Sequence, residues 1–151
     1  MGKLIVIEGL DGSGKATQSR LLCQRLEQQG IGCKKVTFPD YDHESAEFVK
    51  LYLSGALGSA EEVGAYAAST FFAMDRYVSF KLRWGKDYND NTILVADRYA
   101  TSNATHQTTK LPREQWDEYL DWMEDYEYGK LGLPRPDMVI FLSVPPTISQ
   151  N

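Results

Sequence analysis

A glycine-rich segment, EGLDGSGKAT, occupies residues 8–17. Gly9, Gly14 and Lys15 satisfy the phosphate-binding pattern G-x-x-x-x-G-K-[ST], but Ala16 stands where the pattern places a hydroxyl. In such a loop, main-chain amides and the following helix N-terminus hold phosphate oxygens, and the lysine reaches the β- and γ-phosphates. The alternative is an ordinary glycine-rich turn. We favour a nucleotide site made by Gly9, Leu10, Asp11, Gly12, Ser13, Gly14, Lys15, Ala16 and Thr17.

The segment Asp97–Arg98–Tyr99 directly follows an apolar run. Ligands of open α/β sheets bind at the carboxyl ends of the strands, which is where this segment is expected to lie. An aspartate there can hold magnesium, and an arginine can neutralise phosphoryl charge. Alternatively, Asp97 caps the next helix and Arg98 pairs with it. Because the chain also contains the glycine-rich loop, we favour magnesium and phosphate binding by Asp97 and Arg98 over the capping alternative.

The segment FFAMDR places Phe72 and Arg76 one helical turn apart. A flat aromatic ring and a guanidinium at this spacing suit the base and the phosphate of one nucleotide. The alternative is that Phe72 widens a core stripe and Arg76 pairs with Asp75 or another acid. Taken alone, the helix pattern favours this structural alternative.

Apolar runs alternate with helical patterns along the chain. Three nearly continuous runs indicate parallel strands covered on both faces, with a weaker fourth candidate: Leu4–Ile7, Ile93–Ala96, Met138–Leu142 and Val36–Phe38. Strands that alternate with helices predict an α/β fold, a three-layer sandwich whose parallel sheet is covered by helices on both faces.

Three helices are expected between these strands. The first follows Lys15, carries Leu22 and Leu26 on one face, and stops at Gly30. The second is one long amphipathic helix over residues 61–84, with a buried stripe of Val63, Ala67, Phe71, Met74, Val78 and Leu82. The third opens at Pro112 and ends near Gly129, burying Trp116, Leu120 and Met123.

Composition narrows the class of protein. The net charge of -5 disfavours a binder of nucleic-acid polymers or of a membrane surface, both of which attract basic proteins. The apolar run Leu4–Ile7 is too short for a signal peptide or a membrane span. Cys23 and Cys33 form no C-x-x-C unit and are expected to be reduced thiols of a cytoplasmic protein, with Cys23 packing on a helix.

Together these segments resemble the thymidylate kinase family of P-loop nucleoside monophosphate kinases. The resemblance covers nearly the whole chain and rests on IEGLDGSGK, FPDY (Phe38–Tyr41), FFAMDR, DRYATSN (Asp97–Asn103) and LGLPRPDMVIFL (Leu131–Leu142). It implies the P-loop NTPase fold and transfer of the γ-phosphoryl group of ATP to dTMP, giving dTDP and ADP. It also implies Mg²⁺ and a homodimer.

The resemblance assigns roles to individual residues. Lys15, Arg98 and Asp11 would be catalytic, with Arg98 clamping phosphate and Asp11 binding the sugar 3′-hydroxyl of the acceptor near the metal. Asp97 and Asp11 would hold Mg²⁺. The acceptor would be bound by Asp11, Phe38, Pro39, Tyr41, Phe72, Arg76, Arg98, Ser102 and Asn103, with Phe72 stacking on thymine and Asn103 contacting the base edge.

Two departures from the family pattern bear on activity. Ala16 removes the loop hydroxyl, so we expect weaker Mg²⁺ binding. Gly12 stands where some members carry an arginine, whereas others supply arginines from a lid after the fourth strand. We expect residues 1–151 to be a single P-loop kinase domain that lacks this lid and the final strand and helix. As a free chain it should have weak or absent kinase activity and a largely preserved dTMP pocket.

Two other functions stay open at this point. The chain could be a P-loop kinase for another deoxynucleotide or nucleoside. Ala16 and the missing lid also fit a non-catalytic nucleotide-binding module.

Overall fold

The computed structural model describes residues 2–145, which fall into two compact units. Unit 1 is formed by the described parts of residues 1–38, 81–99 and 135–151, and unit 2 by residues 39–80 and 100–134. The chain therefore passes from one unit to the other four times.

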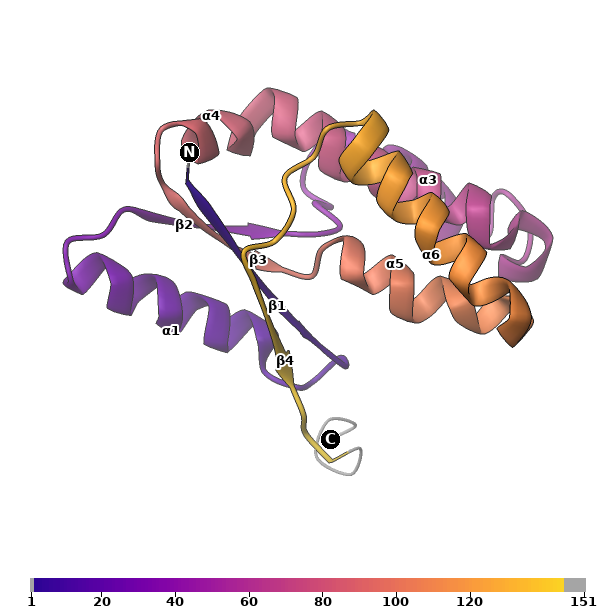
Figure 1. The fold of residues 1–151 in the computed structure, drawn as a ribbon, viewed down its shortest axis with the longest axis horizontal. Coiled ribbons are helices and arrows are strands. Elements are labelled where there is room, and N and C mark those ends of the chain that lie inside the picture. Colours follow the sequence, from indigo (N-terminus) through magenta and orange to yellow (C-terminus); the bar gives the residue numbers. More distant parts are fainter. Residues whose placement is uncertain (1, 146–151) are drawn as a thin grey trace. The chain divides into compact units, whose positions relative to one another are not determined.

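Unit 1 contains a parallel sheet of four strands in the order β2-β3-β1-β4 (Figure 1). The strands are β1 (Lys3–Gly9), β2 (Cys33–Thr37), β3 (Ile93–Asp97) and β4 (Met138–Leu142). All four predicted strands are confirmed. The carboxyl ends of β1 and β3 lie side by side, because Ile7 is in register with Asp97. This places the glycine-rich loop next to the segment that follows β3.

The expectation that all the strands are covered on both faces is wrong for β4. Met138, Val139 and Phe141 are 55%, 47% and 63% exposed, so this strand is not covered on both faces. Its position explains the exposure, because among the described strands β4 lies at the edge of the sheet and pairs with β1 alone. The central strands β1 and β3 are buried as predicted.

Helix α1 (Lys15–Gln28) packs on the sheet as predicted. Leu22 and Leu26 lie against a buried cluster that includes Ile7 and Val95. Gly30 has φ 78, a left-handed conformation that favours glycine and lies just beyond the helix end.

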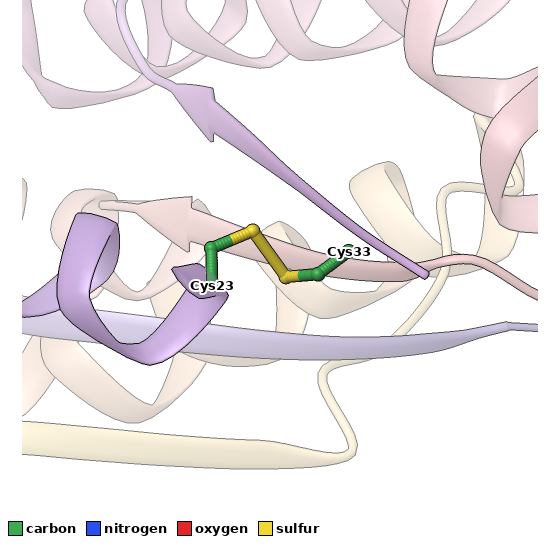
Figure 2. The surroundings of a disulfide bond; sticks show 2 residues. All are labelled: Cys23 and Cys33. Carbon is green, nitrogen blue, oxygen red and sulfur yellow. A yellow bond between two sulfur atoms is a disulfide. The ribbon is translucent and has the colours of Figure 1, made fainter. Parts of the chain in front are cut away.

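The prediction of reduced thiols is wrong. Cys23 of α1 and Cys33 of β2 form a disulfide (Figure 2). The physical reason is the packing of α1 on β2, which brings the two Cα atoms to 5.5 Å, within the usual range for a disulfide. The buried position of Cys23, expected from helix packing, is confirmed.

Unit 1 also has an aromatic core. The ring of Phe38 meets Trp84 and Tyr99 edge-on, with centroids 5.9 and 5.8 Å away. Trp84 ends a π-helical turn, η2 (Phe80–Trp84), which leads into the short helix α4 (Gly85–Asn89).

Unit 2 is helical. Its main helices are α2 (Glu47–Leu53), α3 (Ala60–Ser79), α5 (Ala100–Gln107) and α6 (Trp116–Glu124). Short turns complete it: η1 (Glu44–Ala46), η3 (Thr108–Lys110), η4 (Arg113–Gln115) and the π-helical η5 (Asp125–Lys130). Tyr119 and Met123 of α6 pack with Ala65 of α3 in its core. Within residues 2–145, no helix is long and apolar enough to cross a membrane.

The stripe predicted for the long helix is wrong. Ala67 is exposed and Leu82 is 59% exposed. The helix ends at Ser79 and is interrupted at Gly64, whose φ of 83 and ψ of 167 are not helical. The buried face instead consists of Ala65, Ala68, Ser69, Ala73, Asp75, Arg76 and Ser79. Polar groups on that face hydrogen-bond inside the protein, which hydrophobic periodicity cannot reveal.

The helix expected to open at Pro112 begins instead with the turn η4, and α6 starts at Trp116. Its buried positions are Tyr119 and Met123, while Trp116 and Leu120 are only half-buried.

Candidate functional site

The glycine-rich loop joins β1 to α1, which is the context that phosphate binding requires. Gly14 precedes α1 with φ 94, and a side chain there would strain the left-handed backbone. A Cβ atom on Gly9 would lie 2.6 Å from Ser13 Oγ and 3.2 Å from the Leu142 carbonyl oxygen, so this side chain and this strand pass close to the Gly9 backbone. Ser13 Oγ is itself buried and has no hydrogen-bond partner among residues 2–145, so a ligand oxygen would satisfy it.

Lys15 lies folded over this loop and is 7% exposed. Its Nζ donates to the carbonyl oxygens of Gly9 at 3.0 Å and Leu10 at 2.9 Å. Burial, and then the nearby Arg98 charge, lower the pKa of Lys15; the carboxylates around it offset this only in part. A buried cation held by neutral carbonyls beside a second cation is an electrostatic arrangement that favours a bound anion.

Arg98 reaches the same loop from the end of β3. Its main-chain amide donates to Ile7 O at 3.0 Å, and its Nη2 donates to Asp11 Oδ1 at 2.6 Å. The same carboxylate oxygen lies 4.0 Å from Lys15 Nζ. Arg98 has φ 68, which is uncommon for a residue with a side chain. The structure thus brings Asp11, Lys15 and Arg98 together.

Asp97 lies beside them and is 8% exposed. Burial raises the pKa of Asp97, and the charges of Lys15, Arg98 and Lys35 offset part of this rise. Within the described residues no group of three or more His, Cys, Asp or Glu side chains could hold a metal. Mg²⁺ often takes only one or two carboxylates and completes its shell with water and substrate phosphates, so Asp97 and Asp11 are suitable donors.

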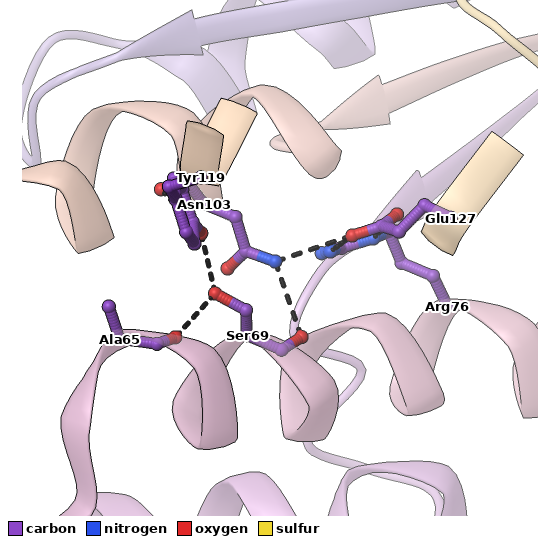
Figure 3. A network of polar contacts seen from close by, with 6 residues as sticks. All are labelled: Ala65, Ser69, Arg76, Asn103, Tyr119 and Glu127. Carbon is purple, nitrogen blue, oxygen red and sulfur yellow. Dashed lines mark hydrogen bonds and ion pairs between the residues drawn. The ribbon is translucent and has the colours of Figure 1, made fainter. Parts of the chain in front are cut away.

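Two further predicted residues, Arg76 and Asn103, meet in unit 2. They belong to a set of side chains that we call the polar cluster: Ser69, Arg76, Asn103, Tyr119 and Glu127 (Figure 3). Arg76 donates through Nε to Glu127 Oε2 at 2.9 Å and through Nη2 to Oε1. Asn103 donates through Nδ2 to Ser69 O and to Glu127 Oε1, both at 3.3 Å. Arg76 therefore pairs with a distant acid, as the structural alternative allowed.

Three members of the polar cluster were not expected from the sequence. Ser69 Oγ lies 2.5 Å from Tyr119 Oη, and burial raises the pKa of Tyr119 to about 12. Glu127 is 1% exposed. The signal that could have found it is the spacing of four residues from Tyr119 to Met123 to Glu127, which continues one helical face.

The FPDY segment spans the boundary between the units. Within unit 2, the Asp40 amide donates to Asp75 Oδ2 at 2.9 Å, and Ser45 Oγ donates to Oδ1 at 2.7 Å. Asp75 is buried, which raises its pKa. It anchors the chain between Pro39 and Tyr41.

The other predicted residues have the following surroundings in their own units. Phe72 meets the Tyr52 ring edge-on at 6.0 Å, and Ser102 is half-buried on α5. Tyr41 is 48% exposed, whereas Phe38 is 4% exposed in the aromatic core of unit 1. Ala16 and Thr17 are exposed on the first turn of α1.

Comparison with known proteins shows which family the chain belongs to. A family model described as thymidylate kinase matches residues 7–151. The chain belongs to the thymidylate kinase family. The parallel α/β fold of the P-loop NTPase class and the resemblance drawn from the sequence are both confirmed.

Individual relatives support the family assignment. The human thymidylate kinase is 35% identical over 143 residues, which cover 95% of this chain and 61% of the relative. The enzyme of Mycobacterium tuberculosis is 31% identical over 144 residues, which cover 93% of this chain and 65% of the relative. The solved thymidylate kinase of Candida albicans superposes with a TM-score of 0.71 at 26% identity, covering 99% of this chain and 66% of that one. This family member thus spans about two thirds of the length of such relatives.

Proposed function

We propose that the protein is a nucleoside monophosphate kinase that transfers the γ-phosphoryl group of ATP to dTMP, giving dTDP and ADP. Family membership supports the reaction class. The observation that carries the proposal in this chain is the convergence of Lys15 and Arg98 on Asp11 beside a phosphate-binding loop. Two cations, one of them buried with a lowered pKa, favour the binding of phosphate groups there.

The proposed chemistry needs little from an acid or a base. The attacking oxygen belongs to a phosphate dianion, which is already a nucleophile, so catalysis consists mainly of alignment and charge neutralisation. Lys15 would exchange its loop carbonyls for oxygens of the donor phosphates. Arg98 would clamp phosphate, and Asp11 would accept the sugar 3′-hydroxyl.

Mg²⁺ is part of the proposal. Asp97 and Asp11 are the residues proposed to hold it, and when bound it would supply positive charge that neutralises phosphate. The exposed Ala16 offers no hydroxyl for this purpose.

In unit 2 we propose that Phe72 stacks on the base of the acceptor, that Arg76 contacts the base or the phosphate of the acceptor, and that Asn103 contacts the edge of the base. Pro39, Tyr41 and Ser102 of unit 2, and Phe38 of unit 1, complete the proposed acceptor residues. A homodimer and a cytoplasmic location are proposed from family membership alone.

The test measures both binding and phosphoryl transfer. Calorimetry on the 151-residue chain should show dTMP binding, and ADP production is measured with ATP and Mg²⁺ present. The longest natural form of the protein should produce ADP with dTMP more efficiently than with dCMP, dGMP or thymidine. Lys15→Ala should abolish this production.

Two outcomes would contradict the proposal. If the protein used dCMP, dGMP or thymidine more efficiently than dTMP, that compound would be the acceptor and the proposed dTMP specificity would be wrong. Nucleotide binding without ADP production by the longest natural form would favour a non-catalytic nucleotide-binding module.

A further inference from the structure

The side-chain amide of Asn103 is held in one orientation. Its Nδ2 donates to two acceptors, Ser69 O and Glu127 Oε1, and an amide nitrogen has only two hydrogens to donate. Turning the amide over would point its oxygen at both acceptors, which fixes the assignment of oxygen and nitrogen. In the described part of the chain, Asn103 Oδ1 accepts no hydrogen bond, as Figure 3 shows for the residues drawn there. Oδ1 is therefore the atom that Asn103 can offer to a ligand.

Glu127 orients Arg76 as well. Both of its carboxylate oxygens accept from the guanidinium, while Oε1 also accepts from Asn103. A two-point contact of this kind fixes the plane of the arginine as well as its position. The main chain at Glu127 is itself anchored, because its carbonyl accepts from the Leu133 amide at 3.1 Å. One buried acid thus sets two of the side chains proposed to face the acceptor.

We propose that Glu127 is a positioning residue that sets the base selectivity of the acceptor site; this rests on the proposed roles of Asn103 and Arg76. By holding Asn103 Nδ2, Glu127 leaves only an acceptor, Oδ1, for the base edge. Thymine and uracil carry a hydrogen on ring nitrogen N3 and can donate to this oxygen. The N3 atom of cytosine is an acceptor, so the same position would place two acceptors face to face.

Two acceptors facing each other would make the site bind cytosine much more weakly than thymine. A site built to accept a hydrogen bond rejects an analogue that cannot donate, because the buried polar atom is left unpaired. Without Glu127, the Asn103 amide keeps only the Ser69 carbonyl as a restraint. It can then turn and donate Nδ2 to the cytosine N3 atom, which weakens the distinction between the two bases.

The test compares the affinities of the 151-residue chain for dTMP and dCMP by calorimetry. The wild-type chain should bind dTMP at least about tenfold more tightly than dCMP, about 1.4 kcal/mol. In Glu127→Gln this ratio should fall about tenfold. Partial loss of folding lowers the binding-competent concentration for both nucleotides alike, so the ratio reports selectivity and not stability. Glu127→Asp, which keeps the charge but withdraws it from Asn103, serves as a second variant and should also lower the ratio.

Tyr119→Phe is the matched control. Tyr119 belongs to the same buried cluster and hydrogen-bonds Ser69 Oγ and the main-chain carbonyl of Asn103, but within the described residues it makes no hydrogen bond to the Asn103 side-chain amide or to the Arg76 guanidinium. The ratio of dTMP affinity to dCMP affinity in Tyr119→Phe should equal that of the wild type. A further probe needs no variant: N3-methyl-dTMP should bind the wild-type chain at least about tenfold more weakly than dTMP, since it cannot donate at N3.

Each contrary outcome has a distinct meaning. An unchanged ratio in the Glu127 variants, or equal binding of N3-methyl-dTMP and dTMP, overturns the role of Glu127. Equal binding of dTMP and dCMP by the wild type also overturns the role of Glu127, but it does not contradict the proposal that the protein is a nucleoside monophosphate kinase. Failure of the wild type to bind any nucleoside monophosphate overturns the proposed function, and this inference with it.

Discussion

The backbone at Arg98 predicts that glycine and alanine substitutions will have different effects on stability. A left-handed conformation such as φ 68 costs a residue with a Cβ atom roughly 1–2 kcal/mol, and glycine avoids this cost. Glycine in turn loses about 0.4–1 kcal/mol more chain entropy on folding than alanine does. Both variants lose the contact with Asp11, whose side chain is 97% exposed, so that loss is small and common to both.

Arg98→Gly should therefore be more stable than Arg98→Ala by about 1 kcal/mol, seen in urea as a difference of about 0.5 M between their midpoints. Calorimetry with ATP and with dTMP should show that both variants bind nucleotide far more weakly than the wild type, because both lack the guanidinium. Equal stability of the two variants would refute the claim of backbone strain. Wild-type affinity in Arg98→Gly would refute the role of the side chain in phosphate binding.

Three other predictions concern separate parts of the chain. A thiol assay on the unfolded, non-reduced protein should find no free thiol, and Cys23→Ser/Cys33→Ser should lower the free energy of unfolding by about 3 kcal/mol in urea. Because the unfolded state ionises tyrosine near pH 10 and the folded state holds Tyr119 to about 12, stability should fall as pH rises between these values. The fall should reach about 3 kcal/mol, because one pKa unit corresponds to about 1.4 kcal/mol. If wild type and Tyr119→Phe lost equal stability over this pH range, the prediction would be contradicted. Ala16→Ser should tighten Mg²⁺ binding in the ATP complex severalfold by fluorescence titration; identical titrations would show that the missing hydroxyl is unimportant.

The phosphate-binding half of the site was predictable because its signals are local. Apolar runs gave the positions of β1 and β3, and parallel pairing then required the residues after them to meet. Asp11, Lys15 and Arg98 lie together for that reason. The left-handed backbone of Arg98 was not predictable, because sequence patterns assign such conformations to glycine and asparagine.

The polar cluster was not predictable in the same way. Hydrophobic periodicity places apolar residues inside, so it misassigned the buried face of α3, where Ser69 and Arg76 are internal. Glu127 pairs with a residue 51 positions away, and although its spacing from Tyr119 and Met123 places it on their helical face, that spacing does not reveal its partner. The disulfide was missed because its pairing depends on how α1 packs on β2.

The buried pair of Arg76 and Glu127 also constrains how the family can diverge at these positions. Removing one partner of a buried ion pair costs about 3–5 kcal/mol, a large part of the 5–15 kcal/mol that stabilises a typical domain. Replacing both partners together by groups of similar volume often costs little. A lineage can therefore change these two positions together far more easily than one at a time. An alignment of relatives should show them covarying, and a redesign of base preference that begins at position 76 has to include position 127.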